Sequence, residues 1–406
     1  MAGALDDLTV LELANWVAGP SAAALMADMG ADVIKIEPLG GDSMRGKLRQ
    51  PAMPEGAPRT DVPFHFSNRG KRGLAVDLAN PEGGALVREL AAKADVVITN
   101  LLPGRLQKFG LGADQLRAAN PGLIYALVTG YGSTGDDADR IAFDLTAFFG
   151  RGAIMSLIGE PGEPPPAFRP GQGDHPTGLA LLTGILAALR VRDRTGEGQV
   201  VETALIRSAA WTIGCDVAAA LVDKVQPTKR GRDEAISPMN TRYRCADDVW
   251  VNLSTLDQGV WPRFCEALGV PELADDERFA TPVDRFRNGR AVVTILDELF
   301  ASQPYAHWAP RLDATGIIWG KVAELPDLIA DPAARHMGMF TSVTHPVVGD
   351  FEMLQAPFSM SASEVSVRGV GPEVPGEHSR EVLASMGVPP DRIDALVDGG
   401  VVGQPS

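Results

Sequence analysis

The sequence predicts an α/β protein in which a large domain, built on an open and mostly parallel sheet with helices on both faces, is joined to a smaller α+β domain. Short apolar stretches alternate with helical segments through the first third of the chain, and this alternation is typical of a parallel sheet. The composition is that of a globular protein, with 45% hydrophobic and 22% charged residues. The 406 residues give room for about two to three domains, and the basic, irregular stretch at 224–238 is typical of a linker.

The first 129 residues support this prediction element by element. An apolar strand at 9–13 is followed by a helix of small residues at 21–29, where Pro20 suits the first turn and Gly30 ends the helix. A second strand at 31–37 completes a βαβ unit. The next predicted elements are a strand at 73–78, a helix from 80 to 93, a strand at 94–100, a helix near 114–119 and a strand at 123–129.

The change from apolar helix to basic, irregular linker near residue 224 gives the main expected domain boundary. The large domain covers 1–223 and ends in a long apolar helix at 202–223. After the linker, a small α+β domain at 239–330 begins with a hairpin at 239–253 and continues with helical segments. The segment 331–406 is expected to return to the large domain, with short strands and then helices at 377–386 and 391–397.

Charge and motif content exclude several classes of protein. A formal net charge of -15 argues against binding nucleic acid or an anionic membrane surface. The first residues have no features of a signal peptide and no apolar run reaches the ~18 residues of a membrane span, so we expect a cytoplasmic protein. The three cysteines are too far apart for a disulfide framework, and the six histidines show no metal-binding spacing, so we expect no metal.

The most informative stretch is GQGDHPTGLALLTGILAALR at 171–190, which is predicted to be a glycine loop running into a helix buried on all sides. Asp174 or Thr177 is expected to cap this helix. The helix dipole should keep Asp174 ionised at neutral pH, and the glycines should let another molecule approach the backbone closely. The alternative is that Asp174 only caps the helix. His175 either orients a substrate or is an incidental loop residue.

Basic residues gather in a turn directly before the predicted strand at 73–78 and in the long loop upstream of it. Arg69, Lys71 and Arg72 lie on a glycine turn, which is either a solvated loop or an electrostatic patch for phosphates. The long loop at 40–63, rich in Gly, Pro and Arg, is expected to be functional. Further cations that add to such a patch are Arg45, Lys47, Arg49, Lys108 and Arg140.

Asp144 is a second carboxylate before an apolar helix. Together with Asp174 and the cationic loops, it suggests acid–base or acyl chemistry on a phosphorylated carrier. The GxGxxG pattern at 130–135 suggests a dinucleotide site, but the three aspartates that follow it disfavour a pyrophosphate.

Many motifs occur together and in order over nearly the whole chain. They are VLEL at 10–13, AGP at 18–20, GADVIKIE at 30–37, Gly41-Asp42 with Arg45, NRGKRGLAVD at 68–77, Ala94-Asp95-Val96 with Asn100 and Pro103-Gly104, the stretch 171–190 with TGEGQ at 195–199, and PGEHS at 375–379 with Gly387. With these motifs the chain resembles the family III CoA-transferases. That group contains formyl-CoA, carnitine and bile-acid CoA-transferases and, as a divergent branch, α-methylacyl-CoA racemase.

The resemblance implies an acyl-CoA:carboxylate CoA-transferase in which Asp174 is the nucleophile and Asp144 a helper at the active site. It also implies a Rossmann-like large domain and a homodimer of interlocked chains. The substrates would be an acyl-CoA donor and a free carboxylate acceptor, with coenzyme A as part of the substrate and no prosthetic group. Residues at positions where the family contacts CoA are Ala18, Leu78, Ala79, Asn100, Lys108 and Arg140; Arg72 is added from the cationic turn.

Departures from the family pattern narrow the expected activity. Val17, Pro38 and the segment 229–237 differ from formyl-CoA transferase, which puts formyl and oxalate substrates in doubt. Phe143 stands where the racemase branch has a catalytic histidine, although Asp257 loosely occupies the region of the racemase's other acid. Alternatives to a transferase are the racemase or an isomerase, a CoA-ester-binding protein without turnover, and a nucleotide-dependent oxidoreductase.

Overall fold

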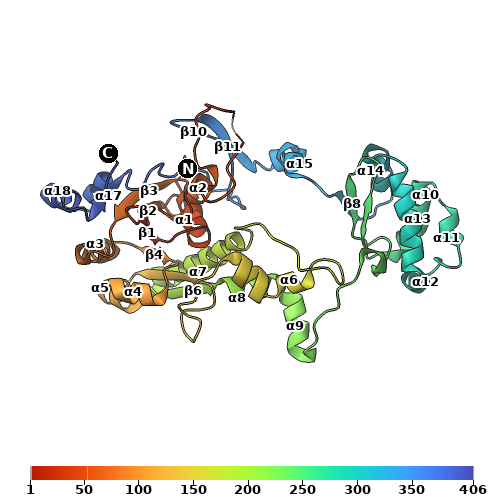
Figure 1. The fold of residues 1–406 in the computed structure, drawn as a ribbon, viewed down its shortest axis with the longest axis horizontal. Helices are drawn as coiled ribbons and strands as arrows, with labels where there is room; N and C mark the ends of the chain where they lie inside the picture. Colours follow the sequence, from red (N-terminus) through yellow and green to blue (C-terminus); the bar gives the residue numbers. More distant parts are fainter. Residues whose placement is uncertain (1, 53, 406) are drawn as a thin grey trace. The chain divides into compact units, whose positions relative to one another are not determined.

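The computed structural model describes residues 2–52 and 54–405, which form two compact units (Figure 1). The larger unit consists of Met1–Ser156, Ala167–Lys224 and Arg335–Ser406, and the smaller unit of Leu157–Pro166 and Val225–Ala334. Residues 157–166 therefore cluster with the smaller unit, although they fall inside the predicted large domain at 1–223. Glu160 contributes to this link, because it pairs with Arg242 and accepts the Arg232 amide hydrogen, and no local pattern reveals contacts with positions so distant in the sequence.

The larger unit is built on a sheet of seven strands in the order β12-β3-β2-β1-β4-β5-β6. The strands are β1 (Thr9–Leu13), β2 (Asp32–Glu37), β3 (Lys71–Val76), β4 (Val96–Thr99), β5 (Ile124–Thr129), β6 (Val200–Ala204) and β12 (Val402–Gly403). Every neighbouring pair is parallel except β12 with β3. The predicted fold class, a mixed α/β protein with a large parallel-rich sheet, is confirmed. Since the chain proceeds outward in both directions from β1, the strand order reverses between β1 and β4, where open α/β sheets bind ligands beyond the carboxyl ends of the strands.

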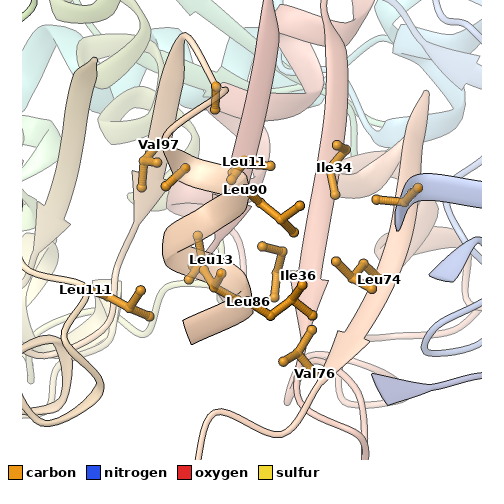
Figure 2. Close-up of a cluster of buried hydrophobic side chains, with 14 of the residues drawn as sticks. Leu11, Leu13, Ile34, Ile36, Leu74, Val76, Leu86, Leu90, Val97 and Leu111 are labelled. Atoms are coloured by element: carbon orange, nitrogen blue, oxygen red, sulfur yellow. The ribbon is translucent and has the colours of Figure 1, made fainter. Parts of the chain in front are cut away.

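Helices cover both faces of this sheet because each face is apolar. On one face, Leu11, Ile34, Leu74 and other strand residues pack against Leu86 and Leu90 of a flanking helix (Figure 2). The helices that contribute to this core are α3 (Pro81–Ala91), α4 (Pro103–Phe109), α5 (Ala113–Ala119), α17 (Ser379–Ser385) and α18 (Pro390–Asp398).

On the other face, two helices of small residues, α1 (Ala18–Asp28) and α7 (Asp174–Thr195), pack closely together. A Cβ atom at Gly178 would collide with Ser21 Oγ and the Ala18 carbonyl oxygen, so glycine is required at this crossing. The close approach brings the N-terminal turns of α1 and α7 together.

Helix α7 is not buried on all sides, which corrects the sequence-based expectation. Leu181, Leu182 and Ile185 face the sheet and α1. Leu179 and Leu186 are each 36% exposed. The sheet and α1 cover only one face of α7 within the chain, so an apolar strip stays uncovered.

The predicted long helix at 202–223 is also wrong. The structure has strand β6, then α8 (Leu205–Thr212) and α9 (Gly214–Asp223), with a bend of 86° between the two helices. Glu202, β-branched Thr203 and Ala204 pair with β5 instead of starting the helix. Among the described residues, no single helix is long and apolar enough to cross a membrane. Helices α8 and α9 reach that length and composition only together, as a bent pair.

The smaller unit is an α+β assembly around an aromatic core that includes Trp261, Phe264, Phe300 and Trp308. Its antiparallel strands are β7 (Arg242–Arg244), β8 (Trp250–Leu253) and β9 (Trp319–Lys321). Its helices are α10 (Trp261–Leu268), α11 (Glu272–Asp275), α12 (Pro282–Arg287), α13 (Gly289–Ala301), α14 (Tyr305–Asp313) and α15 (Leu325–Ala330), with short 3₁₀ turns η2 (Arg232–Glu234) and η3 (Gln258–Val260).

Other, mostly short elements complete the chain. They are α2 (Val62–Asn68), the π-helical turn η1 (Leu145–Arg151), α6 (Ile154–Leu157), α16 (Pro332–His336) and the hairpin of β10 (Phe340–His345) and β11 (Gly349–Leu354). Helices α2 and α4 were not predicted from the sequence.

Candidate active site

The candidate site lies in the larger unit, beyond the carboxyl ends of β1 and β4. Asn15 follows β1 and Asn100 follows β4, and the two residues join these strand ends. The Asn15 amide nitrogen donates to Asn100 Oδ1 at 3.0 Å, and Asn100 Nδ2 donates to the Asn15 carbonyl oxygen at 2.7 Å. This junction fixes the loop that leads into α1, whose first turn contacts the first turn of α7.

Asp174 is the first residue of α7 and is half-buried. The N-cap residue is Gly173, and no side chain caps the helix, so neither Asp174 nor Thr177 acts as the expected cap. Burial, and after it the negative charge of Asp144, raise the pKa of Asp174 to about 7. The expectation that Asp174 stays fully ionised at neutral pH is therefore wrong, because desolvation and a like charge outweigh the helix dipole.

Asp144 is buried at the start of η1 and binds the glycine loop before α7. Its carboxylate accepts hydrogen bonds from the amides of Gly171 at 2.8 Å and Gly173 at 3.1 Å, and from the amide of Leu145 at 2.8 Å. These two glycine amides are therefore not free to bind a reacting oxyanion, because Asp144 already occupies them. Asp144 therefore positions the loop that carries Asp174.

The glycine loop is held from a second side by an aromatic ring. A Cβ atom at position 173 would lie 2.6 Å from Phe148 Cγ, so only glycine allows η1 to pack this closely on the loop. The ring of His175 packs edge-on against Phe66 at 5.3 Å between centroids. Burial, followed by the charge of Arg69, lowers the pKa of His175, so it favours the neutral imidazole.

An aromatic pair borders the same site. Trp16 has a backbone φ of +66°, which is unusual for a bulky residue. Its ring lies edge-to-face with Phe143, with 5.0 Å between centroids. Phe143 directly precedes Asp144 and is 46% exposed. In the sequence, Phe143 stands out only as the residue in place of a histidine, and Trp16 was not predicted as a site residue.

The cationic turn is not a solvent-facing patch. Arg69 is buried and bound to Asp28, with Nη2 at 2.6 Å from Oδ2. Lys71 is buried, and its Nζ lies 2.5 Å from Glu12 Oε2. The interpretation of Arg69 and Lys71 as a phosphate patch is therefore wrong, since buried carboxylates already pair with both charges.

Arg72 is partly exposed, but its guanidinium binds Asp32 at 2.5 Å and Glu381 at 3.2 Å. A CoA contact by Arg72 stays a prediction. Arg45, in the long loop before α2, is paired with Glu37 at 2.9 Å.

The other residues predicted to contact CoA all follow carboxyl ends of parallel strands, and so lie toward one edge of the sheet. Ala18 begins α1 after β1, and Leu78 and Ala79 follow β3. Asn100 follows β4, with Lys108 in the last turn of α4, and Arg140 lies in the loop after β5. Lys108 is exposed, whereas Arg140 pairs with Asp137 at 3.2 Å.

A cluster outside the Asp144–Asp174 pair was missed by the sequence analysis, because its members are far apart in the chain. Nε2 atoms of buried His65 and His345 each lie 2.9 Å from Glu373 Oε2, and Thr60 Oγ1 donates to the same oxygen at 3.0 Å. Thr60 and Glu373 also line a cavity of about 600 Å³ between the long loop and the β10–β11 hairpin. By position, the side chains of His65, His345 and Glu373 form a group that could hold a metal ion.

The hydrogen bonds of His345 do not suit a metal ligand. Its Nδ1 accepts the amide hydrogen of Val347 at 3.0 Å, so the neutral ring carries its proton on Nε2. A metal-binding histidine instead donates from one nitrogen and ligates through the other. The cluster is therefore described best as a hydrogen-bonded junction, in which Glu373 is the shared acceptor.

A doubly wound parallel sheet with two carboxylates at the helix N-termini beyond its strand ends defines an α/β enzyme with carboxylate chemistry. The sequence profile described as "CoA-transferase family III" matches residues 5–379. The chain is 30% identical over 402 residues to (R)-2-hydroxy-4-methylpentanoate CoA-transferase of Clostridioides difficile, covering 98% of this chain and 99% of that protein. It is 33% identical over 387 residues to succinate–glutarate CoA-transferase of Agrobacterium fabrum, covering 94% of this chain and 95% of that protein.

A solved structure agrees with these matches. The crystal structure of a CAIB/BAIF family protein from Brucella suis superposes with a TM-score of 0.85 at 33% identity, covering 95% of this chain and all of that one. The chain belongs to the CoA-transferase family III and is a CoA-transferase, which confirms the resemblance noted in the sequence. Enzymes of this kind use CoA thioesters as substrates.

Proposed function

We propose that the protein transfers CoA from an acyl-CoA donor to a free carboxylate acceptor, with Asp174 as the covalent nucleophile. The observation that carries this proposal is the placement of Asp174. It is half-buried, it begins α7 beyond the carboxyl ends of β1 and β4, and Asp144 fixes the loop before it. A pKa of about 7 leaves a large share of Asp174 ionised at neutral pH, and a carboxylate with a raised pKa is a stronger nucleophile than an ordinary one.

The proposed reaction has four balanced steps. An Asp174 oxygen attacks the thioester carbonyl carbon, the C–S bond breaks, and an aspartyl mixed anhydride and CoA thiolate form. The thiolate then attacks the aspartyl carbonyl, which releases the first acid as a carboxylate and leaves an aspartyl-CoA thioester. The acceptor carboxylate attacks the carbonyl of that thioester, the C–S bond breaks, and a second anhydride and CoA thiolate form. The thiolate then attacks the acyl carbonyl of this anhydride, and the bond from that carbon to the Asp174 oxygen breaks. The products are the new acyl-CoA and free Asp174, and no proton is consumed.

Two further parts of the proposal concern the substrate and the assembly. CoA would lie along the carboxyl edge of the sheet, where Ala18, Leu78, Ala79, Asn100, Lys108, Arg140 and Arg72 were predicted to contact it. The chain would act as a homodimer. Uncovered apolar residues support this, among them Trp211 at 88% exposure and Val222 at 86%, together with the uncovered strip on α7. Light scattering on the purified protein would give the mass of the assembly.

Racemisation is the second candidate function, because a racemase of this family would also act on an acyl-CoA. It requires a base within hydrogen-bond reach of the α-carbon on each face. Phe143 cannot accept a proton. Asp257 accepts the Gly259 amide hydrogen within the smaller unit, at 2.8 Å. Covalent exchange needs neither residue, and this favours transfer.

Trapping and isotope exchange test the proposal together. Incubation with a 2-methylacyl-CoA, followed by hydroxylamine, should leave a hydroxamate on the peptide that contains Asp174, and a free acid should receive CoA. The same incubation in D₂O should leave the α-carbon without enzyme-dependent deuterium. Rapid deuterium uptake with no CoA exchange and no trapped adduct would instead establish racemisation.

A further inference from the structure

We propose that Trp16 and Phe143 form an aromatic wall that selects the acyl group. The wall favours acids whose chain is apolar, branched or aromatic over dicarboxylic acids. This inference rests on the proposed function, because it assumes that the acyl carbon reacts at Asp174.

The wall lies beside the reacting carboxylate. Phe143 directly precedes Asp144, whose carboxylate accepts the amide hydrogen of Gly173, and Gly173 directly precedes Asp174. Trp16 comes directly before Val17 and Ala18, at the start of the helix that crosses α7 at Gly178. Both sides of the pair are therefore tied to the first turn of α7, one through Asp144 and the other through α1.

The backbone at Trp16 is held in an unfavourable conformation by its surroundings. A φ of +66° is an outlier for a tryptophan, and such strain gathers at functional sites when the neighbouring structure enforces it. The Trp16 amide nitrogen donates to Asp42 Oδ1 at 3.1 Å, and Asp42 Oδ2 pairs with buried Lys35 at 2.8 Å. The strained conformation turns the indole toward Phe143 while the backbone stays anchored.

Apolar residues of the long loop support the pair from behind. Trp16 packs on a small cluster of buried Val17, Met44 and Phe64, together with half-buried Leu48. The wall thus has a buried apolar base and a partly exposed aromatic front. Such a front is suited to a ligand side chain, since an edge-to-face pair presents a rigid surface with few rotatable bonds.

The cation that lies behind this wall is already paired and does not attract a second carboxylate of the substrate. Arg45 lies over the Phe64 ring at 3.8 Å, but both of its Glu37 contacts are at 2.9 Å, so its charge is already neutralised. A dicarboxylic acyl chain placed on the aromatic front would lose hydration without gaining Arg45 as a counter-ion. A branched or aromatic chain would instead gain contact area.

The test compares acceptor acids with one acyl-CoA donor. The acids are 4-methylpentanoate, 3-phenylpropionate, acetate, succinate and glutarate, and the measured quantity is kcat/KM for each. The wild type should prefer the first two acids over the dicarboxylates by at least roughly tenfold, the low end of what one hydrophobic contact achieves. In Trp16→Gly and Phe143→Ala, the ratio of 4-methylpentanoate to acetate should fall roughly tenfold.

The two variants separate the loss of an aromatic ring from a change in the Trp16 backbone. Glycine adopts positive φ without strain, so Trp16→Gly removes the ring while relaxing the backbone. Phe143→Ala leaves the Trp16 backbone unchanged. Phe286→Ala is the matched control, because Phe286 is 49% exposed in the smaller unit, and its acid preference should equal that of the wild type.

A preference for succinate or glutarate in the wild type would overturn the wall and point to the exposed Lys47 and Arg49 beside Leu48. Unchanged ratios in both folded variants would overturn it too. In these outcomes the hydroxamate at Asp174 still forms, so the proposed function stands. Failure to form the adduct or to transfer CoA with every acid would refute the proposed function, and the wall with it.

Discussion

Replacement of Asp174 by asparagine should abolish transfer and, at neutral and alkaline pH, stabilise the folded protein. The folded-state pKa of about 7 is raised above the ordinary value of 3.8. A group with a raised folded pKa contributes stability that is fully present below pH 3.8 and is lost as the pH rises through 7. Asparagine has nearly the same shape and never ionises, so the variant avoids this loss.

The structure sets the size of the effect. The step from 3.8 to about 7 spans roughly three pH units, which corresponds to at most about 4 kcal/mol at 1.36 kcal/mol per unit. Because Asp174 is only half-buried, solvent screens part of this penalty, and a gain of about 2 kcal/mol is the working expectation. The gain should grow between pH 4 and pH 7 and level off above that range.

Differential scanning fluorimetry between pH 4 and pH 9 measures this effect as the difference in Tm between variant and wild type. Asp114→Asn is the matched control, since Asp114 is an exposed aspartate in the first turn of α5. Its Tm difference should not follow the same pH curve. A pH-independent difference for Asp174→Asn, or a variant less stable than the wild type at pH 8, would refute the reasoning that the site holds Asp174 in a destabilised charged form.

Three other changes have defined outcomes. Asp144→Asn removes the smaller of the two causes that raise the pKa of Asp174, so the midpoint of the pH–rate profile should move down by at most about 1.5 pH units. Its rate should also fall, because an amide fixes the glycine loop less well. Arg69→Met leaves Asp28 buried without its partner, and urea unfolding should show a loss of about 3–5 kcal/mol. Glu373→Leu removes the acceptor shared by three donors, and the same assay should show a loss of about 1–3 kcal/mol.

Local patterns were enough to predict much of the sheet. Strand β1 has the predicted bounds, and β2, β4 and β5 lie within a few residues of them, because an apolar run bounded by turn residues is a local signal. The βαβ alternation predicted an open and mostly parallel sheet, but the order of its strands was not predicted. Residues 202–204 were predicted as helix but form the end of β6, since pairing of β6 with β5 is a tertiary contact that overrides helix propensity. The break between α8 and α9 was not predicted.

The candidate site was predicted in its residues but not in its electrostatics. Asp174 and Asp144 were singled out from their positions before helices. The amides of Gly171 and Gly173 bind Asp144, which lies 27 and 29 residues earlier in the chain, and no local pattern reveals a contact over that distance. Lys71 shows the same limit, because its partner Glu12 comes from a different strand. A lysine on a glycine turn is expected to be solvent-exposed, and its burial follows only from the packing of the strands.

The edge strand β12 has a consequence for how the protein is made. Gly403 and Val402 pair with Ala75 and Val76 of β3, so this edge of the sheet is completed by residues that leave the ribosome more than 300 positions after β3. The whole of the smaller unit is synthesised in between, and it has its own aromatic core. During translation the smaller unit is therefore free to fold first, while the β3 edge of the larger sheet stays open. A nascent chain stalled before residue 402 would expose that edge to pairing with other strands, which makes late translation the stage most vulnerable to aggregation.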